Sequence, residues 1–198
     1  MFFKNSIPFF MIVTLLCTTS IVKPHDVLVE GKAAAFMPTG QTFKENFSTS
    51  GLFGFEITSK IVGNVYAFGS FDFLNKSGNT QFFQTATKVY MSNFGIGLKY
   101  FIPTESCCDL YVGLGAQPTY LRTIDSSDVV TQHSRWGWGG IAKIGAIINL
   151  PKSFFVDLFI DYSFVTINFT NTFNAPLQSA NAVLNGAIFG LGFGYRFN

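Results

Sequence analysis

The sequence has little charge, and this shortage limits the kinds of protein that it can encode. Of 198 residues, 12% are charged, whereas 48% are hydrophobic and 17% are aromatic. Soluble domains usually contain about twice this share of charged residues, so the chain has too few charges to cover a water-facing surface. The formal net charge of +2 also argues against a nucleic-acid-binding surface. These shortages favour a membrane protein.

Long apolar runs are also scarce. Beyond the N-terminus, the glycine-rich end at 184–197 is the only long apolar stretch. A membrane-spanning helix needs about 20 apolar residues, so the sequence disfavours a bundle of such helices. An apolar composition without long apolar runs is typical of a transmembrane β-barrel, because each strand crosses with only about 9 to 11 residues.

Residues 1–20 have the pattern of a cleaved signal peptide. Lys4 precedes an apolar segment at 7–17, and small residues follow at 18–20, near the expected cleavage site. An uncleaved anchor helix is the alternative. Cleavage would leave Cys107 and Cys108, which are adjacent and whose Cα atoms, about 3.8 Å apart, are too close for ordinary disulfide geometry. We expect two free thiols; the alternative is a cross-link to another envelope protein through Cys107 or Cys108.

The C-terminal stretch 184–197 alternates strictly. Phe189, Leu191, Phe193, Tyr195 and Phe197 share one parity, and the other parity carries mostly glycine. A period of two predicts a β-strand with lipid on one face and a crowded barrel interior on the other. The alternative is a helix with glycines at every fourth position. It is disfavoured because the run is short and each helical glycine costs about 1 kcal/mol.

Seven more segments alternate in the same way, which gives eight predicted strands. They are 27–36, 52–60, 65–74, 88–102, 109–121, 136–150, 154–164 and 184–197. The connections alternate between long (38–51, 75–87, 122–135, 165–183) and short (63–64, 103–108, 151–153). This rhythm is typical of an antiparallel meander with long outer loops and short periplasmic turns. It predicts one all-β domain at 27–198, an eight-stranded antiparallel up-and-down transmembrane β-barrel.

The ending G-F-G-Y-R-F, the signal peptide and the eight-strand rhythm resemble the small outer-membrane barrels of Gram-negative bacteria. These include the transmembrane domain of OmpA, OmpX and the OmpW-like proteins, and the resemblance covers about 27–198. It implies a bacterial outer-membrane location and an assembly signal at Tyr195 and Phe197 that the barrel-assembly machinery reads. Asn198 follows Phe197, whereas in that class the last aromatic residue usually ends the chain.

Ten charged residues share the inward parity of the predicted strands. About half are acidic and half basic, and an eight-stranded barrel is narrow enough for side chains to fill its interior. Buried charges persist only when they are paired, so we expect a salt-bridge network that closes the lumen. The alternative is a narrow path for small solutes. The residues are Glu30, Lys32, Glu56, Lys60, Asp72, Lys99, Lys143, Asp157, Asp161 and Arg196.

Aromatic residues near the strand ends predict interfacial girdles. They are Tyr90, Tyr100, Trp136, Trp138 and Tyr162, together with Tyr195. Trp136 and Trp138 adjoin a predicted outer loop, where stacking on a carbohydrate is an alternative role.

Candidates for catalysis are few. The chain has two histidines, His25 and His133, and neither has a recognisable spacing to a serine or carboxylate partner. No metal-ligand or nucleotide motif is present. A soluble lipocalin-like barrel is disfavoured because its polar face would need more charge. We therefore expect a structural or surface-interaction protein in outer-membrane lipid, without enzymatic activity, cofactor or nucleic-acid partner.

Overall fold

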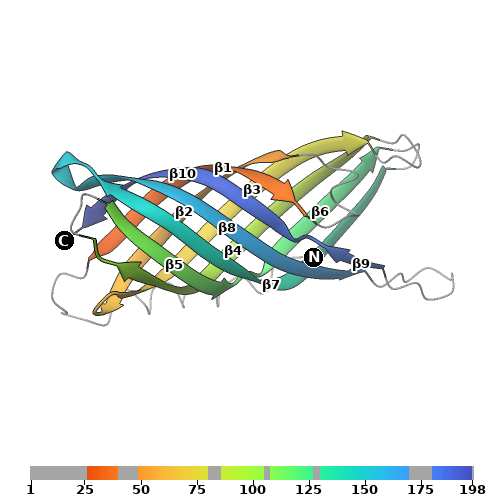
Figure 1. Ribbon diagram of the computed structural model, residues 1–198. Helices are drawn as coiled ribbons and strands as arrows, with labels where there is room; N and C mark the ends of the chain where they lie inside the picture. Colours follow the sequence, from red (N-terminus) through yellow and green to blue (C-terminus); the bar gives the residue numbers. More distant parts are fainter. Residues whose placement is uncertain are drawn as a thin grey trace, which may run out of the picture.

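The chain forms a single sheet that curls into a closed barrel (Figure 1). The computed structural model describes residues 26–39, 49–79, 86–104, 108–126, 130–169 and 180–197. The elements are β1 (Val27–Pro38), β2 (Ser50–Val62), β3 (Val65–Asn79), β4 (Ala86–Ile102), β5 (Cys108–Ala116), β6 (Thr119–Ser126), β7 (Val130–Asn149), the 3₁₀ turn η1 (Pro151–Ser153), β8 (Phe154–Phe169), β9 (Ala180–Val183) and β10 (Gly186–Phe197). Within these ranges, no helix has the length and apolar character to cross a membrane.

Ten strand segments make eight positions in the barrel wall. β5 and β6 both pair with β4 and β7, and β9 and β10 both pair with β8, so each couple is one interrupted strand. β1 pairs with β10 over its whole length, from Val27 opposite Phe197 to Pro38 opposite Gly186, and this pairing closes the sheet. All pairings are antiparallel. The predicted eight-stranded antiparallel barrel is confirmed.

The two interruptions keep their backbone hydrogen bonds. At the first, Pro118 has no N–H, but its carbonyl accepts from the N–H of Phe94 at 2.9 Å. The N–H of Gln117 donates to the carbonyl of Gly139 at 2.8 Å. At the second, the side-chain oxygen of Asn185 accepts from the N–H of Val165 at 3.1 Å. Such bonds matter because an unsatisfied backbone group in lipid costs several kcal/mol.

Two tight turns lie at one end of the barrel. Gly63 has φ of 54° in the turn between β2 and β3. Lys152 and Ser153 also have positive φ, 63° and 64°, in the turn η1 between β7 and β8. The first residue of β1 and the last residue of β10 lie at this same end (Figure 1). By the usual rule for such barrels, the end with the short turns faces the periplasm.

Several strands are longer than the sequence predicts. Residues 75–87 were expected to form a loop, but β3 continues to Asn79 and β4 begins at Ala86. The expected loop at 122–135 is mostly strand in β6 and β7, and the one at 165–183 contains the end of β8 and all of β9. These predicted boundaries were wrong because polar residues in water can still pair as strands. β7 has 20 residues, about twice the 9 to 11 that a crossing needs.

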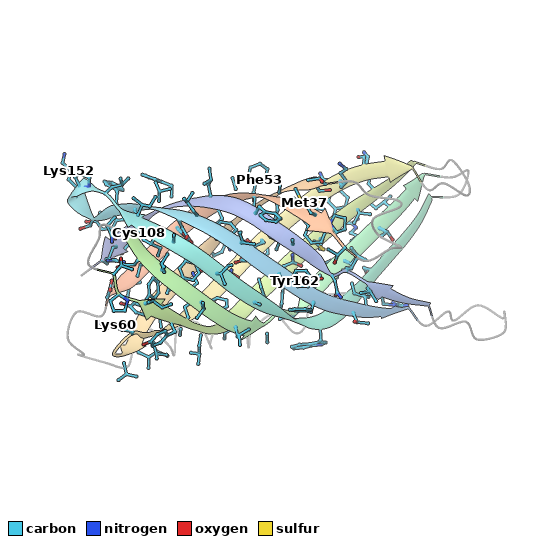
Figure 2. The ribbon with its side chains drawn as sticks, viewed as in Figure 1. Met37, Phe53, Lys60, Cys108, Lys152 and Tyr162 are labelled. Atoms are coloured by element: carbon cyan, nitrogen blue, oxygen red, sulfur yellow. The ribbon has the colours of Figure 1, made fainter. Side chains whose placement is uncertain are left out.

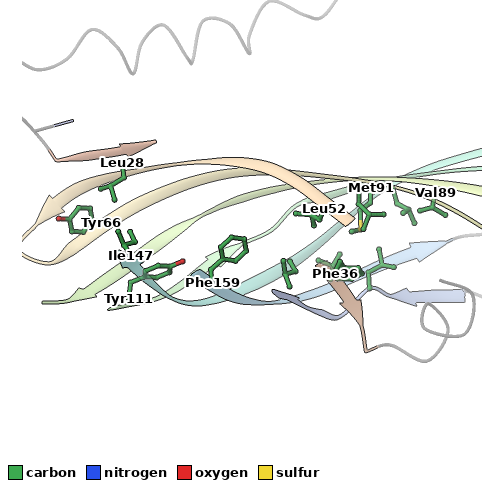
Figure 3. Close-up of a cluster of buried hydrophobic side chains, with 14 of the residues drawn as sticks. Leu28, Phe36, Leu52, Tyr66, Val89, Met91, Tyr111, Ile147 and Phe159 are labelled. Carbon is green, nitrogen blue, oxygen red and sulfur yellow. The ribbon is translucent and has the colours of Figure 1, made fainter. Parts of the chain in front are cut away.

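The outer surface is an apolar belt, and the inner surface is layered. Outward side chains such as Phe53, Leu98 and Leu114 are exposed, as a lipid-facing surface requires. Inside, the buried hydrophobic residues form one cluster along the barrel axis, with a group toward each end and Phe159 between them (Figure 3). The group nearer the tight turns includes Leu28, Tyr66, Phe101, Tyr111, Ile147 and Phe155, and the group nearer the other end includes Phe36, Leu52, Leu74, Val89 and Met91. Along β1, Glu30 and Lys32 lie between the two groups.

Candidate functional site: the ionic lumen

Eight of the ten charged residues predicted to face inward lie buried in the lumen. They are Glu30, Lys32, Glu56, Asp72, Lys99, Lys143, Asp157 and Asp161, each with an exposed fraction of 6% or less. Their position follows from the alternation of each strand, because every second side chain points inward. They occupy the layer between the two hydrophobic groups, so this cluster closes the barrel where a channel would run.

Glu56 is the central residue of this network. One of its carboxylate oxygens lies 3.3 Å from the Nζ of Lys32 and 3.2 Å from the Nζ of Lys143. The other oxygen is in contact with the Nζ of Lys99 and accepts a hydrogen bond from the hydroxyl of Thr58 at 3.2 Å. One carboxylate on β2 therefore joins lysines from β1, β4 and β7 across the lumen.

Two more ion pairs extend the network. The Nζ of Lys32 lies 3.2 Å from Asp72, and the Nζ of Lys143 donates to Asp161 at 2.5 Å. Lys143 and Asp161 are directly opposite each other on β7 and β8, which places their side chains on the same inner face. Each of these two lysines thus contacts two carboxylates, whereas Lys99 contacts Glu56 alone among the described carboxylates.

Aromatic rings and glycines complete the packing around the lysines. The Nζ of Lys99 lies 4.1 Å from the ring centroid of Tyr111, and the Nζ of Lys143 lies 5.3 Å from that of Phe68. Both distances suit a cation–π interaction. At Gly113, a Cβ atom would lie 3.1 Å from the Cγ of Lys99. The glycines on the inward parity therefore leave room for the long side chains of neighbouring strands.

The buried charges do not balance. The eight residues comprise five carboxylates and three ammonium groups, a formal excess of two negative charges when all are ionised. Glu30 and Asp157 have no lysine within ion-pair distance in the described ranges. One oxygen of each lacks a hydrogen-bond partner there, although Asp157 also accepts from the hydroxyl of Tyr111 at 2.8 Å. Glu30 is also directly opposite Glu56 in the β1–β2 register.

The other two predicted lumen residues lie at the end with the tight turns. Arg196 is half-buried and pairs with Asp26 at 3.5 Å and with Asp109 at 3.4 Å. Lys60 lies over the ring of Tyr66, with its Nζ 5.9 Å from the ring centroid (Figure 2). These two cations therefore do not offset the acidic excess in the middle of the barrel. The expectation of equal numbers of acidic and basic charges does not hold for the buried layer.

Sequence reasoning missed several members of these clusters. Asp109 and Tyr111 are on the inward parity of β5, so the same rule could have identified them. Asp26 precedes β1 and accepts a hydrogen bond from the hydroxyl of Tyr66 at 2.8 Å. No local pattern marks it, because its partners come from distant parts of the chain.

Most of the predicted interfacial aromatics lie on the outer surface. Tyr100, Trp136 and Trp138 are exposed, as is the proposed assembly signal Tyr195 and Phe197. Tyr90 and Tyr162 are half-buried, and the hydroxyl of Tyr162 is 2.9 Å from that of Thr39. The rings of Phe71, Phe94, Trp136 and Tyr120 follow one another across β3, β4, β7 and β6, with neighbouring centroids 5.0 to 6.0 Å apart.

Some of the other predicted features lie outside the residues that the structure describes. Residues 1–25, with the expected signal peptide and His25, lie outside the described ranges, as does Cys107. His133 is in β7, opposite Thr123, but its side chain is not described. Cys108 begins β5 and is half-buried. Across the described residues, no group of three or more His, Cys, Asp or Glu side chains could hold a metal ion.

Comparisons with known proteins agree with this fold. Structures similar to the chain include OprG from Pseudomonas aeruginosa, at 14% identity with a TM-score of 0.64, covering 89% of this chain and 97% of OprG. Outer membrane protein W of E. coli is 16% identical with a TM-score of 0.59, covering 89% of this chain and 100% of that protein. Ail, the attachment invasion locus protein of Yersinia pestis, is 15% identical with a TM-score of 0.54, covering 89% of this chain and 100% of Ail. These likenesses show the fold.

A comparison with curated protein sequences finds no match. The family described as "Outer membrane protein beta-barrel domain" matches residues 23–197, nearly the whole chain. That match confirms the resemblance inferred from the C-terminal motif and places the protein in the outer membrane of Gram-negative bacteria. This chain therefore belongs to the outer-membrane β-barrel family.

Proposed function

We propose that this protein is a non-conducting, non-enzymatic barrel with a structural or surface-contact role in the outer membrane. The observation that carries the proposal is the buried network around Glu56, which is 1% exposed and joins three lysines across the lumen. Hydrophobic groups lie on both sides of this network along the axis. A solute would have to displace both the ion pairs and the hydrophobic groups to pass.

The strand lengths support a surface-contact role. β3, β4 and β7 have 15, 17 and 20 residues, so the barrel wall extends past the membrane at the end opposite the tight turns (Figure 1). This extension would hold the outer connections away from the lipid surface. Ail, whose name describes attachment, has the same fold at 15% identity, and attachment is the form of surface contact that we favour.

A narrow cation path is the second candidate, and the acidic excess in the lumen favours it. The unpaired oxygens of Glu30 and Asp157 would attract cations if the network opened. Single-channel recording in a planar bilayer separates the two candidates. We expect no reproducible steps from the wild-type barrel. Reproducible cation-selective steps would overturn the closed-lumen proposal and establish the second candidate.

The surface-contact role needs its own assay. Cells that display the barrel should adhere to a surface or to other cells better than cells that lack it, while the permeability of their outer membrane to small solutes stays the same. Glu30→Gln is a suitable variant for this comparison because the substitution lies inside the lumen, where Glu30 is 5% exposed. It should leave adhesion unchanged if the outer end makes the contact. Equal adhesion with and without the barrel would contradict the proposal.

A further inference from the structure

Glu30 and Asp157 are the lumen carboxylates that the described ion pairs leave without a lysine. Both are almost fully buried, with exposed fractions of 5% and 1%. The Oε2 of Glu30 and the Oδ1 of Asp157 have no hydrogen-bond partner among the described residues. Burying an ionised carboxylate without such partners is so costly that the group takes up a proton instead. The unpartnered oxygens therefore mark a place where the lumen needs a further positive charge.

The two carboxylates approach each other across a glycine. Glu30 is on β1 and Asp157 is on β8, and Gly192 lies on β10 between these strands, directly opposite Asp157. A Cβ atom on Gly192 would overlap the Oε2 of Glu30 and would lie 3.2 Å from the Cβ of Asp157. The carboxylate of Glu30 thus extends over Gly192 toward Asp157, and β10 has no side chain there to separate them.

Glu30 also has a carboxylate on its other side. Glu56 of β2 is directly opposite Glu30 in the register of β1 and β2. Glu56 stays ionised because three lysines surround it, namely Lys32, Lys99 and Lys143. An ionised Glu30 would therefore lie between Glu56 and Asp157, both negatively charged. Two carboxyl groups that share a site in this way keep one proton between them, because like charges at close range disfavour the second ionisation.

The remaining charged and titratable groups around the pair do not remove this need. Lys32 and Lys99 are in contact with other carboxylates and act on Glu30 only over a longer distance. The hydroxyl of Tyr111 on β5 donates to Asp157 at 2.8 Å and stabilises one negative charge in the pair. The groups that face the pair from the surrounding strands are Lys32, Glu56, Asp72, Lys99, Tyr111, Lys143, Asp161 and, at the end with the tight turns, Arg196.

We propose that Glu30 and Asp157 bind one proton between them at neutral pH, which makes the middle of the lumen a proton-binding site. The proton lowers the formal excess of the buried layer from two negative charges to one. The hydroxyl of Tyr111 stabilises the charge that remains. At alkaline pH the proton leaves to the solvent, the full excess returns, and repulsion weakens the closed layer. This inference rests on the closed lumen proposed above and names the ligand of its buried layer.

Infrared spectroscopy of the full barrel detects such a proton directly. The protein is measured at pH 7 in a maltoside detergent, which contains no ester carbonyl, and the carbonyl stretch of a protonated carboxyl group is identified by its shift in D₂O. We expect this band in the wild type and its loss in Glu30→Gln. Asp109→Asn is the matched control, because Asp109 pairs with Arg196 at the end of the barrel, and it should keep the band. Absence of the band from the folded wild type, or its persistence in Glu30→Gln, would overturn the proposal.

The pH dependence of stability gives a second measurement. Unfolded carboxyl groups ionise near pH 4, so above that pH the folded barrel binds one more proton than the unfolded chain, and its stability falls as the pH rises. Between about pH 5 and 8, we expect the unfolding equilibrium constant of the wild type to rise relative to that of Glu30→Gln by up to tenfold per pH unit. Asp109→Asn should keep the pH dependence of the wild type, and equal pH dependence of the wild type and Glu30→Gln would overturn the proposal.

A metal cation is the other charge that such a pair can hold. At constant pH and ionic strength, the stability of the wild type should be the same in potassium chloride and in choline chloride. Greater stability in potassium chloride that is absent from Glu30→Gln would overturn the proposal, because a bound metal cation would then neutralise the pair. Conductance tests the closed lumen separately, so a barrel without conductance and without the infrared band would refute the proton site alone.

Discussion

Replacing Glu56 by glutamine removes the carboxylate that three buried lysines share. Lys32 and Lys143 keep Asp72 and Asp161 as partners, at 3.2 Å and 2.5 Å. Lys99, which is 2% exposed, keeps no carboxylate within ion-pair distance. Its Nζ lies 4.1 Å from the ring centroid of Tyr111, and Asp157 and Glu30 interact with it only over a longer distance. The cost therefore falls mainly on Lys99, whose charge loses its one close carboxylate.

Breaking a buried ion pair by removing one partner costs about 3 to 5 kcal/mol. The remaining cation–π contacts of Lys99 offset part of this loss, since each is worth roughly 0.5 to 2 kcal/mol. We expect Glu56→Gln to lower the free energy of unfolding by about 3 kcal/mol. Lys99→Met should restore part of it in the Glu56→Gln background, because the unpaired charge is then absent.

Glu30→Gln is the matched control, with the same chemical change at another buried carboxylate of the same layer. Glu30 is 5% exposed, has no described ion pair, and is directly opposite Glu56. Its replacement lowers the negative excess in the lumen and removes a like-charge repulsion between directly opposed residues. We therefore expect the free energy of unfolding to stay the same or to rise by up to about 1 kcal/mol.

The assay is urea unfolding of the barrel in lipid vesicles, followed by the fluorescence of Trp136 and Trp138, which are exposed to lipid. Detergent gels without boiling report the folded fraction independently. A free energy of unfolding for Glu56→Gln within about 1 kcal/mol of the wild-type value would refute the central role of Glu56. An equal loss of stability in Glu30→Gln would refute it as well.

The next three predictions concern glycine packing, the end of the barrel and assembly. Gly97→Ala should cost about 1 to 3 kcal/mol in urea unfolding, because its Cβ would overlap the backbone of Leu114 and Gly115 on the neighbouring strand. Gly31→Ala should change stability little, because its Cβ would have nothing within 4 Å. Equal effects of the two substitutions would contradict the packing argument. Arg196→Ala should lower the free energy of unfolding by about 1 kcal/mol, since its two ion pairs are partly exposed. In 1 M salt, the variant and the wild type should be equally stable. A larger loss that salt leaves unchanged would contradict this account of the two ion pairs. Phe197→Ala should lower the amount of heat-modifiable barrel in cells but leave refolding in vesicles unchanged. Phe53→Ala, which changes another exposed residue of the outer surface, should assemble normally in cells. Normal assembly of both variants in cells would argue against an assembly signal at the C-terminus.

The alternation of residue types and the lengths of the connections were enough to predict the fold. Each strand has an apolar face and a small or polar face, because side chains in an extended chain point alternately to opposite sides. This local rule predicted eight strand positions, and the alternation of long and short connections predicted their order and antiparallel direction. The same parity places eight of the ten selected charges in the buried layer. The strand ends were predicted less well, because polar residues such as those of 75–79 pair as strands in water without an apolar face.

The tertiary structure decided which charges meet. Glu56 and Lys99 are 43 positions apart in the sequence and come from strands that are not neighbours in the wall, so only the closure of the barrel and the tilt of its strands bring them into contact. The same closure leaves Arg196 and Lys60 at the end of the lumen rather than in its centre, which gives the middle layer its acidic excess. Parity is a property of one strand and can be read from the sequence, whereas an ion pair depends on the relative height of two strands, which is fixed only when the sheet closes.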